Sequence, residues 1–201
     1  MSESGRVQSW LAEAARVIAS VDPVEVAAAV QALADVQAAR GTIFTAGNGG
    51  SASTASHFAL DLQKWARRDG RGMRAISLSD SIGLITAWAN DTDFERVFSE
   101  QLATLGAPGD ALVVFSVSGS SPNLLAALET ARERQIVTVG VLGKDGGRAR
   151  ALVDHAVVVR SEDYGWVESA HLVLDHVMTY AMRDGHPRQG AGARAAVSTR
   201  K

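Results

Sequence analysis

Short apolar runs alternate with helical patterns along this chain, and this alternation restricts the possible folds more than any other feature. The runs cover residues 42–46, 74–78, 111–115, 136–141 and 155–159, and the helical patterns cover 51–66, 81–90, 93–105, 124–134 and about 164–182. The run at 111–115 is apolar throughout, as expected for a parallel strand covered on both faces. The alternation predicts an α/β fold, a three-layer sandwich with a five-stranded parallel sheet and right-handed crossovers.

The first forty residues precede the sheet and are predicted to form a helical hairpin. Asp22 is a suitable N-cap, Pro23 suits the first helical position, and Glu25 completes a capping box. The helix that follows is rich in alanine and amphipathic. Such a hairpin either joins subunits or packs on the chain's own sheet, and the sequence leaves both possibilities open.

Composition narrows the class of protein. The 201 residues suffice for one domain with a hydrophobic core, which we place at residues 1–184. The net charge of −2 gives no reason to expect nucleic acid as a partner, and without cysteine a metal ion would need histidine, carboxylate or amide ligands. Because no signal peptide or long apolar run is present, we expect a cytoplasmic protein without membrane contact. Residues 185–201, rich in Gly, Ala and Arg, are expected to be a disordered tail.

A glycine-rich turn at residues 47–53, with the sequence GNGGSAS, connects the first predicted strand to its helix. Glycine allows a sharp turn, and the first amides of the helix attract an anion. His57 and Asp61 follow four residues apart on one helix face, which suits two ligands of one metal. On spacing alone, a histidine and an aspartate that stabilise a solvent-exposed helix face would be commoner. The position of this pair behind the glycine-rich turn favours a role in a functional site instead. The turn also matches G-x-G-x-x-A, but the acidic residue of a dinucleotide site is missing from the end of the second strand, which disfavours a nucleotide.

A serine-rich turn follows the third predicted strand. Residues 116–123, with the sequence SVSGSSPN, offer several hydroxyl and amide groups at the start of a helix, which suits one phosphate. A single serine would be an ordinary helix cap, but four around a glycine favour phosphate binding. Ligands of parallel sheets bind beyond the carboxyl ends of the strands, where both turns lie. The sequence therefore predicts a site for a phosphorylated small molecule.

Together these motifs resemble the sugar isomerase (SIS) domain family, and within it the phosphoheptose isomerases, which convert sedoheptulose 7-phosphate to a heptose 7-phosphate. The resemblance spans roughly residues 5–183. It is carried by GNGGSA at 47–52 with His57-Phe58-Ala59, by Ala89-Asn90-Asp91, by SVSGSSPN at 116–123, and by Glu168 through His176. It implies a five-stranded parallel sheet, a homotetramer with active sites at subunit interfaces, and often a bound zinc ion.

The resemblance also implies roles for individual residues. The phosphate would be bound by Ser116, Val117 (through its amide), Ser118 and Ser121, the sugar by Asn48, Gly49, Gly50, Ser51 and Asp91, and the family's metal and catalytic positions correspond to His57, Asp61, Glu168 and His176. By helical periodicity alone, Glu168 shares a stripe with His171 and Asp175. Spacing would therefore pair Glu168 with His171, whereas the resemblance selects His176. His155 lies in a predicted strand and is expected to be structural.

The chain departs from the phosphoheptose isomerase pattern at four positions. Asp61 stands where these enzymes have a glutamate, Glu168 where they have a glutamine, Val117 where they have a threonine, and Gly165 where they have an aspartate. Asp61 is one methylene shorter, so a base there must be placed more than about 1 Å differently, a shift that can matter greatly to catalysis. Glu168 adds an anion that could strengthen a metal site or transfer a proton. These changes leave the reaction class intact but open the choice of substrate and product.

Isomerisation of a ketose to an aldose requires an acid and a base beside the carbonyl and a positive group near the enediolate oxygen. The resemblance implies an isomerase that forms a D-glycero-D-heptose 7-phosphate from sedoheptulose 7-phosphate, and we adopt this as the prediction. Asp61 or Glu168 would take the proton from C1, His176 would deliver one to C2, and zinc, not a nucleotide, would be the cofactor. The alternatives are another sugar phosphate or product stereochemistry, a non-catalytic tetramer that binds a protein, and a sugar-phosphate-sensing regulatory domain. The retained acids and histidine disfavour the protein-binding tetramer, and the lack of a DNA-binding segment disfavours the regulator.

Overall fold

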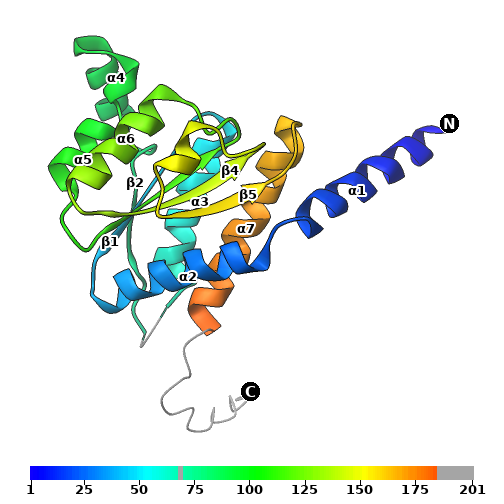
Figure 1. Cartoon of the computed structure of the whole chain (residues 1–201), viewed down its shortest axis with the longest axis horizontal. Helices are drawn as coiled ribbons and strands as arrows, with labels where there is room; N and C mark the ends of the chain where they lie inside the picture. The colour runs from blue at the N-terminus through cyan, green and yellow to red at the C-terminus, as the bar shows by residue number, and fades with distance from the viewer. Residues whose placement is uncertain (68–69, 185–201) are drawn as a thin grey trace, which may run out of the picture.

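The computed structural model describes residues 1–67 and 70–184, so the predicted tail lies outside the described residues. Its five strands form one parallel sheet in the order β2-β1-β3-β4-β5 (Figure 1). The strands are β1 (Thr42–Gly47), β2 (Arg74–Ser77), β3 (Ala111–Ser116), β4 (Val137–Gly143) and β5 (His155–Val159). The helices are α1 (Glu3–Ala19), α2 (Pro23–Ala38), α3 (Gly50–Lys64), α4 (Ile82–Asp91), α5 (Ser99–Leu105), α6 (Pro122–Glu133) and α7 (Tyr164–Asp184), with 3₁₀ turns η1 (Phe94–Arg96) and η2 (Arg148–Ala151).

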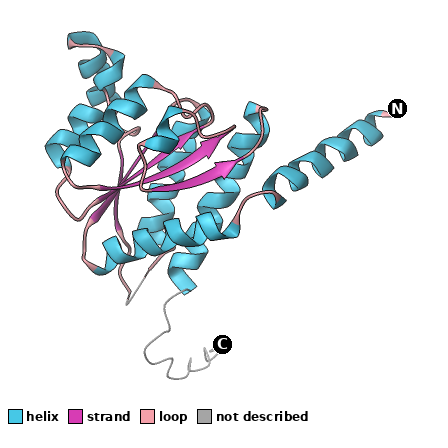
Figure 2. Ribbon diagram, in the orientation of Figure 1, coloured by secondary structure: helices cyan, strands magenta, loops and turns pink. Residues whose placement is uncertain are grey.

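Helices cover both faces of the sheet, which confirms the predicted three-layer sandwich (Figure 2). Side chains of β3 alternate between two cores: Val113 packs with α2, α3 and α7, whereas Leu112 and Val114 pack on the opposite face, with α6 and Leu102 of α5. Because every residue of β3 is buried, the strand reads as a continuous apolar run in the sequence. The sheet is thus a rigid platform for the turns at its carboxyl edge.

Most predicted elements match the structure within a few residues, and one does not. The helix expected over residues 93–105 is divided into η1 and α5. The amide of Arg96 donates to the carbonyl of Asp93 at 3.2 Å, which is the tighter 3₁₀ pattern. Strand β4 extends two residues beyond its predicted end because Gly143 still pairs with Val159 of β5.

The two N-terminal helices have different environments. Helix α2 packs on the chain's own sheet, and its Glu25 Oε2 accepts a hydrogen bond of 3.0 Å from the amide of Val158 on the edge strand β5. Helix α1 projects away from the body (Figure 1), and its Trp10 and Leu11 are 57% and 67% exposed. The axes of α1 and α2 are bent by 60°, so the helices do not run back along each other as in a hairpin.

Within residues 1–67 and 70–184, no single helix is long and apolar enough to cross a membrane. Helices α1 and α2 together have the length and apolar composition of a membrane span, but their axes are bent by 60° at the break between them.

Candidate active site and metal centre

The glycine-rich and serine-rich turns meet at the carboxyl edge of the sheet. They follow β1 and β3, which are neighbours although β2 lies between them in the chain. Asn48 and Asn123 join the turns through two reciprocal amide hydrogen bonds, each 2.9 Å long. Strand order reverses at this point, and such crevices are where open α/β sheets bind ligands. The structure therefore brings together the two turns that the sequence singled out.

The glycine-rich turn leaves the start of α3 open to a ligand. Gly49 is the N-cap of α3 and has a φ of +56°, a conformation that favours glycine. In the described chain, no side chain caps this helix end, so its first amides remain available for an anion. The hydroxyl of Thr45 in β1 donates to the carbonyl of Ala55 at 2.8 Å, which fixes α3 against the sheet.

Hydrogen bonds within the serine-rich turn give it a defined shape. Ser116 Oγ accepts from the amide of Gly119 at 3.0 Å, and Ser118 Oγ accepts from the amide of Ser120 at 3.2 Å. Ser121 is the N-cap of α6, yet its hydroxyl makes no capping bond within the described residues. An ordinary cap serine would make that bond, so the hydroxyl of Ser121 remains free for a ligand. Beside the turn lies a cavity of about 460 Å³ that includes Asn48, Phe94, Ser121 and Asn123 in its lining.

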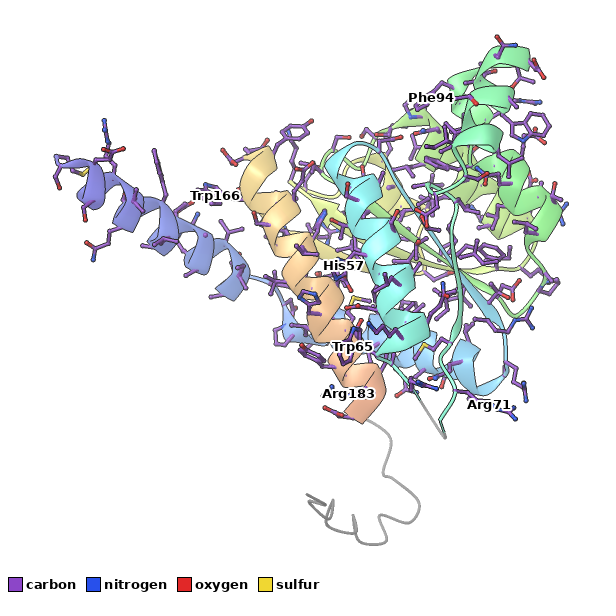
Figure 3. The ribbon with its side chains drawn as sticks, turned by 180° about the vertical axis from the view of Figure 1, so that it is seen from behind. His57, Trp65, Arg71, Phe94, Trp166 and Arg183 are labelled. Atoms are coloured by element: carbon purple, nitrogen blue, oxygen red, sulfur yellow. The ribbon has the colours of Figure 1, made fainter. Side chains whose placement is uncertain are left out.

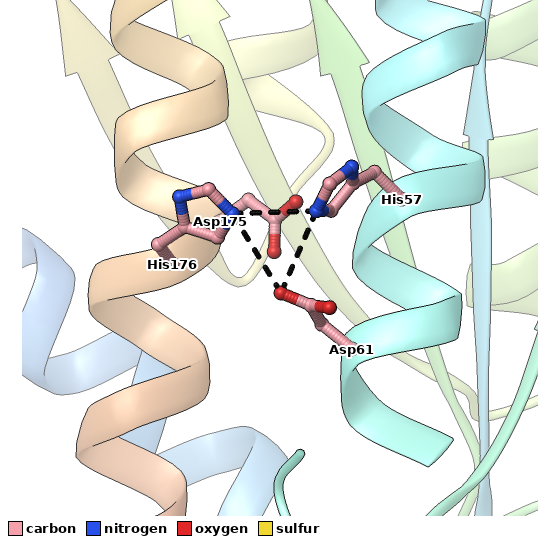
Figure 4. Close-up of side chains that lie close together, drawn as sticks. All are labelled: His57, Asp61, Asp175 and His176. Atoms are coloured by element: carbon pink, nitrogen blue, oxygen red, sulfur yellow. Dashed lines mark hydrogen bonds and ion pairs between the residues drawn. The ribbon is translucent and has the colours of Figure 1, made fainter. Parts of the chain in front are cut away.

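A second cluster of polar side chains lies between α3 and α7. His57 and Asp61 from α3 and Asp175 and His176 from α7 each offer one ligand atom, and these atoms lie within 4.8 Å of one another (Figure 4). His57 Nε2 is 3.3 Å from His176 Nε2. Asp61 Oδ2 is 3.7 Å from His57 Nε2 and 3.8 Å from His176 Nε2. Three residues of the predicted metal site, His57, Asp61 and His176, therefore converge.

The acids of this cluster are buried, whereas the imidazole rings reach the surface. Asp175 is fully buried and Asp61 is 5% exposed, but the side chains of His57 and His176 are 44% and 42% exposed. Burial, and then the nearby charge of Asp61, raises the pKa of Asp175 to about 7. A bound cation would favour the ionised carboxylates and offset their repulsion.

The geometry of the cluster fits a zinc ion. Zinc binds imidazole nitrogen at about 2.0–2.1 Å and carboxylate oxygen at about 2.0–2.2 Å. From the three distances above, one point lies about 2.1 Å from His57 Nε2, Asp61 Oδ2 and His176 Nε2. The protein's own residues therefore match the size and the ligand type of a divalent metal site.

Glu168 lies two turns before His176 on α7, at the other end of the site. A Cβ atom placed on Gly50 would lie 2.6 Å from the carboxylate of Glu168. Glu168 therefore covers the glycine-rich turn at the start of α3. Eight residues separate it from His176, about 12 Å along the helix. The described structure groups Asp175, not Glu168, with the two histidines and Asp61. Sequence reasoning noted Asp175 only as a member of the α7 stripe.

The remaining predicted residues lie outside this cluster. Ser51 is buried in the first turn of α3, and Asp91 is exposed at the end of α4, where it accepts a bond of 2.8 Å from Asn90. His171 is fully buried beside Phe115, and burial lowers its pKa to about 4. His155 is the first residue of β5, so it lies at the amino ends of the strands, whereas the two turns lie at their carboxyl ends.

Comparison with known proteins places this fold and site in a family. The sequence pattern of the SIS domain matches residues 9–143, so the chain belongs to the SIS domain family. Phosphoheptose isomerase from Trichlorobacter lovleyi is 42% identical over 139 residues, which cover 69% of this chain and 71% of the relative. The same enzyme from Burkholderia pseudomallei is 39% identical over 177 residues, 86% of this chain and 90% of the relative. Within the SIS domain proteins, the chain thus belongs to the phosphoheptose isomerases.

Solved structures agree with this assignment. Phosphoheptose isomerase from Neisseria gonorrhoeae is similar with a TM-score of 0.83 and 29% identity, over 90% of this chain and 98% of that one. The enzyme from Francisella tularensis has a TM-score of 0.85 and 25% identity, over 91% and 99% of the two chains. The predicted resemblance is therefore confirmed in sequence and in fold.

Proposed function

We propose that this protein is an aldose–ketose isomerase that converts sedoheptulose 7-phosphate to a D-glycero-D-heptose 7-phosphate through an enediolate. Its relatives are phosphoheptose isomerases. The main support is the position of His57 on α3. This helix begins at Gly50 in the glycine-rich turn, and His57 lies seven residues further on, about 10 Å along the helix axis. A substrate with its phosphate and carbonyl at opposite ends of a long chain fits this spacing.

The two turns bind the phosphate and the sugar in this proposal. Amides of the serine-rich turn, including that of Val117, and the free hydroxyl of Ser121 hold the phosphate. Ser116 and Ser118 set the shape of that turn through their hydrogen bonds. Asn48 and Ser51 contact the sugar, together with the backbone of Gly49 and Gly50, and we propose the same for Asp91.

The cluster between α3 and α7 would hold a divalent metal, which we propose is zinc, through His57, Asp61 and His176. Bound there, the ion would stabilise negative charge on the enediolate oxygens. Because these three donor atoms face one another, Glu168 is the predicted carboxylate that remains free to move a proton. A sugar that extends from the turns to the cluster passes Glu168 at Gly50. We therefore propose that Glu168 takes the proton from C1 and returns it to C2.

The alternative acid–base pair is Asp61 and His176, whose facing atoms are 3.8 Å apart. This pair could exchange protons with the substrate only while no metal occupies it. The two assignments predict different results for a substitution that abolishes turnover without loss of the metal. Glu168→Gln should do so under our assignment, because its carboxylate lies outside the cluster.

The test incubates zinc-loaded protein with sedoheptulose 7-phosphate and identifies the aldose by NMR, which also distinguishes the product stereochemistry. We expect Glu168→Gln to lower kcat by at least about 100-fold, as for loss of a general base. Glu129→Gln, an exposed change on α6, is the matched control and should keep full activity. Absence of turnover by the wild-type protein, with and without zinc, would refute the function.

We further propose that the protein is a cytoplasmic homotetramer with its active sites at subunit interfaces. Helix α1 projects from the body (Figure 1) and exposes the large apolar side chains of Trp10 and Leu11, which a neighbouring subunit would cover. Beside the metal cluster, Trp65, which follows the last residue of α3, and Tyr180 of α7 are exposed. Figure 3 shows Trp65 on the same side of the molecule as His57. Absence of cysteine suits a reducing compartment. Light scattering should show a tetramer that Trp10→Glu dissociates and Glu13→Gln, a neighbouring exposed change, leaves intact.

A further inference from the structure

The loop between β4 and η2, residues 144–147, packs backbone to backbone against the serine-rich turn. The amide of Ala149 donates to the carbonyl of Gly119 at 2.7 Å, and the amide of Arg148 donates to Ser120 Oγ at 3.4 Å. These two amides are the first of η2, so the turn supplies the acceptors at the start of η2. The loop follows the turn in the chain only after α6 and β4, so this contact is a product of the fold.

Two glycines make the close contact possible. Gly119 has a φ of +58° and Gly147 has a φ of +53°, conformations that favour glycine. A Cβ atom on Gly119 would overlap the carbonyl oxygen of Gly146. A Cβ atom on Gly147 would lie 2.6 Å from Ser120 Oγ and 2.8 Å from the carbonyl oxygen of Gly119. A larger residue at either glycine would therefore push the loop and the turn apart.

The contact fixes the orientation of one peptide group of the turn. Because a trans peptide is planar, the carbonyl of Gly119 and the amide of Ser120 point in opposite directions. The carbonyl points to the amide of Ala149, while the amide of Ser120 donates to Ser118 Oγ at 3.2 Å. Glycine is conformationally free, so this peptide group could rotate if the loop did not hold it. A carbonyl oxygen turned toward a bound phosphate would repel it.

We infer that Gly147 is a positioning residue for phosphate binding, because its loop holds the peptide group between Gly119 and Ser120 in the orientation that the serine-rich turn needs. This inference rests on the proposed function, which places the phosphate of the substrate at this turn. Gly147 itself does not touch the substrate. The metal cluster lies between α3 and α7, so we expect a change at Gly147 to affect phosphate binding much more than the chemical step.

The test compares phosphate binding by Gly147→Ala and by the wild type. Inorganic phosphate, used as a competitive inhibitor, reports on the turn alone, and sedoheptulose 7-phosphate reports on the whole site. Loss of one hydrogen bond to a charged group weakens binding by about 10- to 100-fold. We expect Gly147→Ala to raise both the inhibition constant of phosphate and the KM by about 10-fold or more. The kcat should change by less than about 3-fold, as for loss of uniform binding.

Gly109→Ala is the matched control. Gly109 also has a positive φ, of +92°, but it lies before β3, and in the described structure its new Cβ would meet nothing within 4 Å beyond its chain neighbours. The control therefore introduces alanine at a positive φ without pressing on the turn, so it should lower stability and leave the inhibition constant of phosphate unchanged. A folded Gly147→Ala with the wild-type inhibition constant would overturn the inference. An equal rise in both variants would do the same.

A second variant covers the case in which Gly147→Ala does not fold. Ser120→Ala removes only the hydroxyl that accepts from the amide of Arg148. We expect it to raise the inhibition constant of phosphate by about 3-fold or more, and to speed hydrogen–deuterium exchange in residues 146–150. Unchanged phosphate binding would then overturn the inference. Weaker binding without faster exchange would also overturn it, since the hydroxyl would then act by touching the phosphate and not by joining the turn to the loop.

Failure of the inference and failure of the proposed function give different results. If the wild-type protein isomerises sedoheptulose 7-phosphate and phosphate inhibits it and Gly147→Ala equally, only the inference fails. If the wild type does not turn over this substrate, but calorimetry shows phosphate binding that Gly147→Ala weakens, the inference stands and the proposed reaction fails. If the wild type binds no phosphate, both the inference and the proposed phosphate site fail.

Discussion

Substitution of Gly50 by alanine tests the position of Glu168 without changing a chemical group of the site. The new Cβ would lie 2.6 Å from the carboxylate, whereas ordinary contact begins at 3.4 Å, so the carboxylate must move by about 0.8 Å. A displacement of about 1 Å at a reacting group can cost about 100-fold in rate. We therefore expect Gly50→Ala to lower kcat/KM by roughly 100-fold.

The same substitution should hardly affect folding. The atoms that must move are the end of a flexible side chain, and alanine in a helix is favoured over glycine by roughly 0.5–1 kcal/mol. We expect the free energy of unfolding of Gly50→Ala to stay within about 1 kcal/mol of the wild-type value. Urea denaturation measures stability, and the isomerase assay measures kcat/KM. Gly83→Ala on α4 is the control, because in the described structure its new Cβ would meet nothing within 4 Å beyond its chain neighbours and the backbone of its own helix.

A double-mutant cycle separates displacement of Glu168 from a direct clash with the substrate. If the methyl group acts through Glu168, adding Gly50→Ala to Glu168→Ala should cause no further loss. A further 100-fold loss would show that the methyl group meets the substrate. Wild-type kcat/KM in Gly50→Ala would refute the reasoning altogether, because the carboxylate could then move without consequence.

Three further predictions concern His171, the asparagine pair and the metal. Burial lowers the pKa of His171 from 6.5 to about 4, so between these pH values the unfolded chain binds a proton that the native protein does not, and stability should fall by up to about 3 kcal/mol as the pH drops. His171→Phe should flatten this part of the pH profile in urea titrations. Asn123→Ala leaves the amide of Asn48 without its partner and should cost about 1–3 kcal/mol. Removal of metal with a chelator should abolish turnover and lower the melting temperature, and zinc at 100 times Kd should restore about 2.7 kcal/mol.

Each of these expectations has an outcome that contradicts it. An unchanged pH profile in His171→Phe would show that other groups cause the acid sensitivity. For the asparagines, Asn48→Ala combined with Asn123→Ala should cost less than the sum of the single changes, and strict additivity would argue against coupling. Full activity of protein shown by elemental analysis to be free of metal would exclude a catalytic ion and favour Asp61 and His176 as the acid–base pair.

The sequence predicts the sheet well because its signals are local. The strand at 111–115 is recognised from its uninterrupted run of apolar residues, and the two turns from their glycines and serines. The predicted helix at 93–105 failed because a 3₁₀ turn and an α-helix share the spacing of their apolar residues over a few positions. The bend between α1 and α2 could not be predicted, since it depends on contacts of α2 with β5 and α7.

The site is predictable only where its residues share an element. His57 and Asp61 were found together because four residues on one helix bring them to one face. Asp175 was recognised as a neighbour of His171 on a stripe, but periodicity does not show which neighbouring helix that stripe faces. The approach of α3 and α7 decides that Asp175 lies at the cluster and Glu168 at Gly50. Convergence of this kind comes from packing of distant segments, which spacing along one chain does not contain.

Under the proposed function, the length of α3 between Gly50 and His57 sets the distance that a substrate must span. A triose or tetrose phosphate anchored at the turns would end before it reaches the histidines, and one held at the histidines would leave the anion cradle empty. A site of this kind would reject shorter sugar phosphates without any steric gate. Such selection by length does not weaken binding of the correct substrate, since a heptulose phosphate reaches both the turns and the histidines at once.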